Sequence, residues 1–94
     1  MSKYYSEPET KEKHEKKLIA DAIDYFRTVI ANGYPNISYE ALRDINNARY
    51  QTALRDKNSS KDQRKYAYER VMYMTLIAPP KGSKPQDWIN ILQK

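Results

Sequence analysis

Cysteine is absent from the 94-residue chain, and this absence excludes several kinds of site. Without cysteine there is no disulfide framework, no thiolate nucleophile and no zinc site with cysteine ligands. Nothing in the sequence therefore points to an oxidising compartment, and we expect a cytoplasmic, intracellular location.

Glycine is almost absent as well, with two residues in the whole chain. This scarcity argues against a turn-rich all-β fold and against a glycine loop that cradles a phosphate. A chain of 94 residues has room for one modest core. We expect a single helical domain over residues 1–94, in which 1–17 form a charged segment that frays or projects and 81–94 form a short helix or docking tail.

Long apolar runs are also missing. The first 17 residues are rich in lysine and glutamate, and they lack the apolar stretch of roughly 7–15 residues that a secretory signal needs. No later run approaches the roughly 20 apolar residues of a membrane span. We expect a soluble protein with no membrane partner.

Catalytic residue types are few. His14 is the only histidine, and it lies among hydrated charges in KEKHEKK, where an ordinary surface side chain is expected. Asp21 and Asp24 share a helix face, but i,i+3 charges of this kind usually form a solvated edge, here paired with Arg27 or with the basic half of the chain. We expect no enzyme, no metal site and no cofactor, because the groups needed for such chemistry do not converge.

Apolar spacing and capping residues predict an all-α fold, a small bundle of three helices plus a short C-terminal helix. The first helix should start near Ser6–Glu9 with a capping box and end at Asn32-Gly33. Between these ends the apolar residues recur at helical spacing, at Leu18, Ile19, Ala22, Ile23, Phe26, Val29 and Ile30.

Capping residues and prolines also predict two further helices. Ser38 is a good N-cap for a helix that runs to about Lys57, and Ser60 with Gln63 forms a capping box for the next. Pro79-Pro80 should end that third helix. We expect its buried face to come from some combination of Ala67, Tyr68, Val71, Met72, Thr75, Leu76 and Ala78.

The C-terminal segment repeats a start signal. Ser83-Lys84-Pro85-Gln86 has the Ser-x-Pro-[Glu/Gln] form seen at Ser6, and an amphipathic stretch follows. Gln86, Ile89, Ile91 and Leu92 give this stretch a loose resemblance to the peptides that dock on bacterial sliding clamps. The predicted protein-binding residues are Trp88, Ile89 and Leu92; the alternative, which we favour, is that they cap the open end of the core.

Positive charge is concentrated in the second half of the chain. Between Arg49 and Lys65 there are six cations and two acids, while the whole chain carries a net charge of +5. Backbone amides at the start of the third helix, near Ser60 and Lys61, should add to this charge, and the combination suits phosphate groups. Tyrosines interleaved with the cations could stack on exposed bases, or could simply border the core.

The predicted nucleic-acid-binding residues are Arg49, Tyr50, Gln51, Arg55, Lys57, Lys61, Arg64, Lys65 and Tyr68. A solvated face is the alternative interpretation of this segment.

Within this region, ISYEALRDINNARYQTALRDKN resembles a helix-turn-helix unit of the repressor type. The resemblance implies a first helix at Ser38–Ile45, a turn at Asn46–Ala48 and a recognition helix at Arg49–Lys57. Arg43 stands where the motif usually has a small residue, and Asn47 stands where it has glycine. One continuous helix with Asn46 and Asn47 exposed is the alternative that we favour.

These observations predict a small regulatory or accessory protein that binds nucleic acid or a nucleic-acid-handling protein complex through its basic surface. One alternative is a protein-binding adaptor or inhibitor, of the viral or mobile-element type, that uses an apolar helix face and the Trp88 tail. Another is a structural assembly subunit. A monomer or a small homo-oligomer fits each of these hypotheses.

Overall fold

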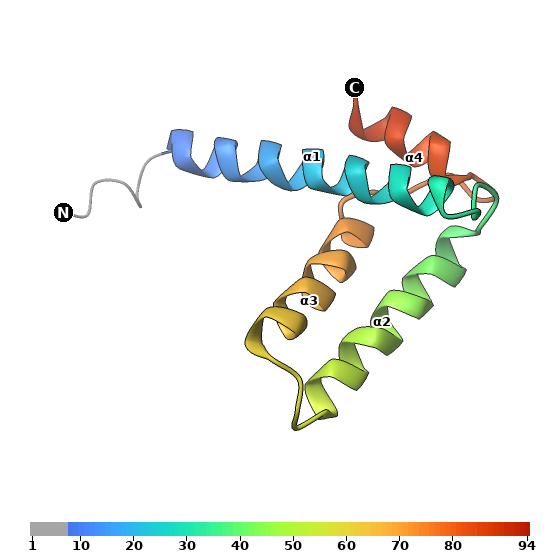
Figure 1. Cartoon of the computed structure of the whole chain (residues 1–94). Helices are drawn as coiled ribbons and strands as arrows, with labels where there is room; N and C mark the ends of the chain where they lie inside the picture. Colours follow the sequence, from blue (N-terminus) through green and yellow to red (C-terminus); the bar gives the residue numbers. More distant parts are fainter. Residues whose placement is uncertain (1–7) are drawn as a thin grey trace.

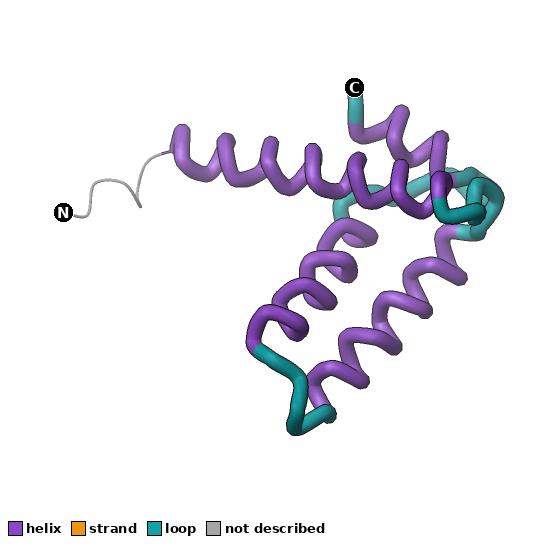
Figure 2. Tube along the Cα trace, viewed as in Figure 1, coloured by secondary structure: helices purple, strands orange, loops and turns teal. Residues whose placement is uncertain are grey.

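A computed structural model describes residues 8–94 of the chain, with side chains from residue 13 onward. This part of the chain contains four helices and no strand, as Figures 1 and 2 show. The predicted all-α fold, with three main helices and a short C-terminal helix, is confirmed. The helices are α1 (Pro8–Ala31), α2 (Tyr39–Arg55), α3 (Lys61–Thr75) and α4 (Pro85–Leu92).

Helix α1 begins at Pro8, in the predicted region, although the predicted cap at Ser6 lies outside the described residues. It ends in a Schellman motif: the Tyr34 amide donates to Val29 O at 3.1 Å, and the Gly33 amide donates to Ile30 O at 3.0 Å. Gly33 has a φ of 100°, a backbone conformation that glycine adopts without steric cost. The predicted end of the helix at Asn32-Gly33 is confirmed.

Helix α2 is continuous from Tyr39 to Arg55, so the predicted helix-turn-helix unit is wrong and the continuous-helix alternative is confirmed. Ser38 caps it as predicted, because its side chain accepts from the Ala41 amide at 3.1 Å. The expectation that Asn46 is exposed is wrong, since this residue is 1% exposed. Its amide Nδ2 donates to the Tyr25 hydroxyl at 3.0 Å, and this bond offsets the cost of burying a polar group.

Helix α3 starts with the predicted capping box. Ser60 Oγ accepts from the Gln63 amide at 3.0 Å, and Gln63 Oε1 accepts from the Ser60 amide at 2.8 Å. The helix ends at Thr75, before the prolines. Steric clash with a proline ring disfavours helical backbone in the preceding residue, so the chain leaves the helix before Pro79.

The buried face of α3 differs from the predicted one. Tyr73 and Met74 are buried, with Ile77 just beyond the helix, whereas Tyr68, Thr75 and Ala78 are exposed. The face is rotated because Tyr73 and Met74 meet the aromatic side chains of α1 and α2: Tyr73 lies against Tyr25, and the Tyr39 hydroxyl donates to Met74 O.

Helix α4 begins one residue later than its start signal predicts. Lys84 is the N-cap, and its amide donates to Asp87 Oδ2 at 2.9 Å, so Asp87 takes the position expected of Gln86. Ser83 has a different role: its Oγ accepts from Trp88 Nε1 at 2.9 Å.

The four helices meet at one end of the α2–α3 hairpin (Figure 1). Helix α1 packs against α4 on one side and α3 on the other, while α2 and α3 pack along each other. The core at this junction contains Ala22, Phe26, Val29, Leu42, Tyr73, Met74, Ile77, Trp88 and Ile89. The hairpin extends away from α1, and none of its residues from 47 to 72 is buried.

None of the four described helices has both the length and the apolar character that crossing a membrane requires.

Candidate functional site

The far end of the α2–α3 hairpin is a well-ordered turn. We call residues 55–65 the hairpin end. Ser59 Oγ lies 2.7 Å from Ala53 O and 2.8 Å from Asp56 O, and it can donate to either carbonyl oxygen. Arg64 Nη1 donates to Ser59 O at 2.7 Å, which ties the start of α3 back to the linker. Local hydrogen bonds therefore fix this end without any buried residue.

Four predicted nucleic-acid-binding cations are exposed together at the hairpin end: Arg55, Lys57, Lys61 and Lys65. The ion pairs within residues 13–94 are Lys17–Asp21, Arg27–Asp24 and Arg43–Asp44, so none of them neutralises these four cations. Asp56, one of the two acids nearby, accepts from the Asn58 amide at 2.9 Å. The positive charge of the hairpin end thus faces solvent.

Two of the other predicted residues, Arg64 and Tyr50, make contacts within the chain, and two, Gln51 and Tyr68, are exposed. Arg64 is half-buried and holds the linker, and Tyr50 is half-buried against Tyr68, with ring centroids 5.4 Å apart. Gln51 is exposed on α2. Tyr68 remains 46% exposed, so part of its ring is open to a ligand.

Some of the backbone amides at the start of α3 already have hydrogen-bond partners within the chain. The Ser60 and Gln63 amides are already bonded within the capping box, and the Arg64 amide donates to Ser60 O at 3.1 Å. The Ser60, Gln63 and Arg64 amides are therefore already used within the chain.

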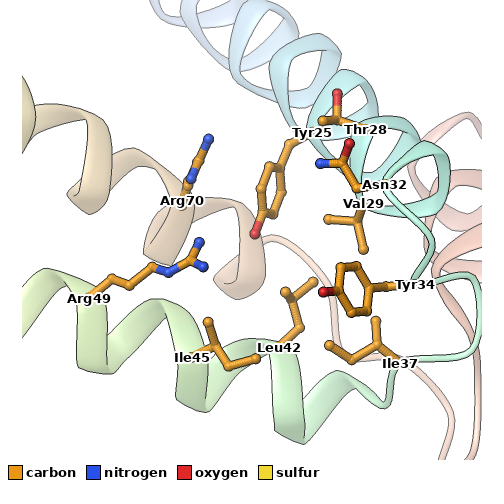
Figure 3. A pocket seen from close by; sticks show the side chains of 10 residues that line it. All are labelled: Tyr25, Thr28, Val29, Asn32, Tyr34, Ile37, Leu42, Ile45, Arg49 and Arg70. Carbon is orange, nitrogen blue, oxygen red and sulfur yellow. The ribbon is translucent and has the colours of Figure 1, made fainter.

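Arg49 is not part of the hairpin end. Its side chain points into a cavity between α1, α2 and α3, where Arg70 of α3 also lies (Figure 3). Sequence reasoning missed Arg70, although its spacing of four residues from Tyr66 is typical of a helical side-chain pair. The Arg70 guanidinium lies 4.1 Å from the centroid of the Tyr66 ring and 5.1 Å from that of the Tyr25 ring, and it donates to the Tyr66 hydroxyl.

Tyr73 borders the same region, in a neighbouring cavity that Asp21, Asp24 and Arg70 also line. Burial raises the pKa of the Tyr73 hydroxyl, and the negative charges of Glu69 and Asp21 raise that pKa further. The hydroxyl therefore stays protonated at neutral pH.

The C-terminal residues belong to the core. Trp88 is 0% exposed and Ile89 is 2% exposed, while Leu92 is half-buried and packs against them. The prediction that they form a protein-docking tail is wrong for Trp88 and Ile89, because no partner reaches a buried side chain without unfolding α4. The alternative, that these residues cap the core, is confirmed.

The predicted surface groups on α1 are where the sequence places them. His14 is exposed. Asp24 Oδ1 lies 3.9 Å from Arg27 Nη1, as the interpretation of a solvated acidic edge predicts, and Asp21 Oδ2 lies 3.6 Å from Lys17 Nζ.

Comparison with known proteins adds no family assignment: no family model, curated protein or solved structure matches the chain.

Proposed function

We propose that the protein acts by binding nucleic acid through the hairpin end, and that it has no catalytic activity. The observation that carries this proposal is the group of exposed cations Arg55, Lys57, Lys61 and Lys65, none of which has an ion-pair partner within residues 13–94. A polyanion provides the countercharge that the described chain does not.

The position of these cations supports contact with a large ligand. The hairpin end projects away from the core (Figure 1), and none of the residues from 47 to 72 is buried. The four side chains are therefore free to follow a phosphate backbone without disturbing the packing of the helices. Their summed field would also steer a polyanion toward this end of the molecule.

Tyrosines beside the cations favour unpaired bases as an additional contact. Tyr66 is 56% exposed and Tyr68 is 46% exposed, and a half-exposed ring can stack on a base that is not paired. One face of Tyr66 is covered by Arg70, so its open face is the one available for stacking.

Salt dependence tests the proposal. Four phosphate contacts correspond to a slope of about −3.6 in log K against log salt for duplex DNA, or a roughly 100-fold loss of affinity between about 50 and 200 mM salt. Fluorescence anisotropy with a labelled oligonucleotide, in single-stranded and duplex form, measures this slope. We expect the quadruple variant Arg55→Gln, Lys57→Gln, Lys61→Gln, Lys65→Gln to lose most of the affinity and to show a much flatter slope.

A charge-matched control variant separates the hairpin end from total charge. Lys13, Lys16, Lys81 and Lys94 are exposed and lie elsewhere in the chain, so their replacement by glutamine lowers the net charge by the same four units. The control should keep most of the slope. Equal losses in the two variants, or no binding by the unmodified protein at about 50 mM salt, would reject the proposal.

A further inference from the structure

A cavity of about 230 Å³ lies where the C-terminal half of α1 faces α2 and α3 (Figure 3). The cavity is partly open to solvent, since Thr28, Tyr34 and Arg49 of its lining are exposed, and its volume suits a small molecule. One wall is apolar and is formed by Val29, Ile37, Leu42 and Ile45. Arg49 points into the cavity from α2, and Arg70 lines it from α3, beside the ring of Tyr25.

The charged side chains that line this cavity are all positive. Its lining includes two guanidinium groups and no carboxylate, and no ion pair within residues 13–94 involves Arg49 or Arg70. The nearest acids on α1, Asp21 and Asp24, line the neighbouring cavity and are paired with Lys17 and Arg27. Negative charge on a ligand would match these two guanidinium groups.

Arg70 is also held in place before any ligand arrives. Its guanidinium lies against the rings of Tyr66 and Tyr25, and Tyr25 is itself fixed by its hydrogen bond with the buried Asn46. Stacked arginine keeps its hydrogen-bond donors in the plane of the guanidinium, where they can bind a carboxylate. Less conformational freedom is lost on binding when the side chain is already ordered.

We propose that this cavity binds a small organic carboxylate whose apolar body is about the size of one aromatic ring. The carboxylate would accept hydrogen bonds from Arg49 and Arg70, and the body would lie against Ile37, Leu42 and Ile45. A free phosphate fits less well, because it has four oxygens that need hydrogen-bond donors and no apolar body to lie against Ile37, Leu42 and Ile45. The inference is independent of the proposed nucleic-acid binding at the hairpin end.

Titration of the full chain with phenylacetate, followed by amide chemical shifts in NMR spectra, tests the inference. We expect a saturable shift centred on Thr28, Ile37 and Ile45. Phenylacetamide has the same shape without the charge, and acetate has the charge without the apolar body. Each should bind at least about 10-fold more weakly, because a charge-assisted hydrogen bond or the burial of a ring is worth at least that factor.

Variants locate the site. Arg49→Gln and Arg70→Gln should each weaken phenylacetate at least about 10-fold, whereas Arg55→Gln, on the same helix as Arg49 but outside the cavity, should leave it unchanged. Arg70 also stacks on two rings, so a second kind of variant guards against misfolding. Ile45 is 40% exposed, and Ile45→Phe should fill the cavity and block binding while leaving both charges in place.

Three results would overturn the inference: absence of saturable binding at about 10 mM phenylacetate, equal binding of the amide, or unchanged binding in folded Arg49→Gln and Ile45→Phe proteins. These results are distinguishable from failure of the nucleic-acid proposal. Arg49→Gln should keep the oligonucleotide affinity that the quadruple variant of the hairpin end loses.

Discussion

Trp88 connects three of the four helices through a single side chain. Its ring meets Phe26 of α1 edge-on at 5.3 Å between centroids and Tyr39 of α2 edge-on at 5.7 Å. Its Nε1 donates to Ser83 in the loop before α4. Because the residue is fully buried, both its apolar surface and its one polar atom contribute to stability.

Replacing Trp88 with alanine should therefore lower the free energy of unfolding by about 3–5 kcal/mol, through lost contacts and the cavity left behind. A chain of this size has only about 5–14 kcal/mol in total. Urea unfolding followed by circular dichroism measures the loss. Ser83→Ala is the control, because it removes only the hydrogen bond and should cost about 1 kcal/mol. A loss below about 1 kcal/mol in Trp88→Ala would contradict the central role of this side chain.

The α2–α3 hairpin is unevenly stabilised along its length. At the junction its helices bury Leu42, Asn46, Tyr73 and Met74 in the shared core. At the hairpin end, the stabilising contacts are the capping box at Ser60 and the hydrogen bonds of the linker, and the Tyr50–Tyr68 pair lies next to it. Such an end opens locally at lower free energy than the core does.

Hydrogen exchange should show this difference directly. We expect amides in the first turns of α3 to exchange faster than those of Ala22, Phe26 and Val29 in α1. Ser60→Ala removes the cap, at a cost of about 1 kcal/mol, and should speed exchange in the start of α3 selectively. Ser38→Ala, the matched change at the α2 cap, should act on α2 instead. Uniform acceleration over all four helices would show that the hairpin end does not open on its own.

Sequence reasoning located the helices because their ends are set by local chemistry. Ser38, Ser60 and Gly33 each act within a few residues, so their roles are readable without a fold. Burial was harder to predict. Asn46 is buried only because Tyr25, 21 residues earlier, supplies a hydrogen bond, and no local pattern signals that pairing.

The candidate site was also predictable only where its residues are neighbours along the chain. Clustered charge in the sequence identified the hairpin end, since its cations are neighbours along the chain. The cavity was not identifiable, because Arg49 and Arg70 line it together only through the packing of α2 and α3. Their shared position depends on long-range contacts that spacing along one helix does not show.

On the scale of the whole molecule, the buried core and the cations of the hairpin end are separated in space. The core lies where the four helices meet, and the exposed cations Arg55, Lys57, Lys61 and Lys65 lie at the other end of the hairpin (Figure 1). Substitutions at the hairpin end therefore change the electrostatic surface without removing core contacts.

The quadruple glutamine variant of Arg55, Lys57, Lys61 and Lys65 should consequently unfold with a free energy within about 2 kcal/mol of the unmodified protein, because exposed substitutions usually change stability by less than about 0.5 kcal/mol each. Relief of repulsion among like charges acts in the stabilising direction. Thermal unfolding by calorimetry measures the difference, with the Lys13, Lys16, Lys81 and Lys94 variant as the charge-matched control. A loss well beyond 2 kcal/mol would mean that these side chains hold the hairpin together.

The turn from α1 into α2 requires a positive φ at Gly33. No atom lies within 4 Å of the place where a Cβ would stand, so space is not what selects glycine there; the φ of 100° is. A D-amino acid prefers that half of the Ramachandran map. The cavity between α1, α2 and α3 is lined from both sides of this turn, by Val29 before it and Ile37 after it, so its shape is coupled to a turn that needs a positive φ.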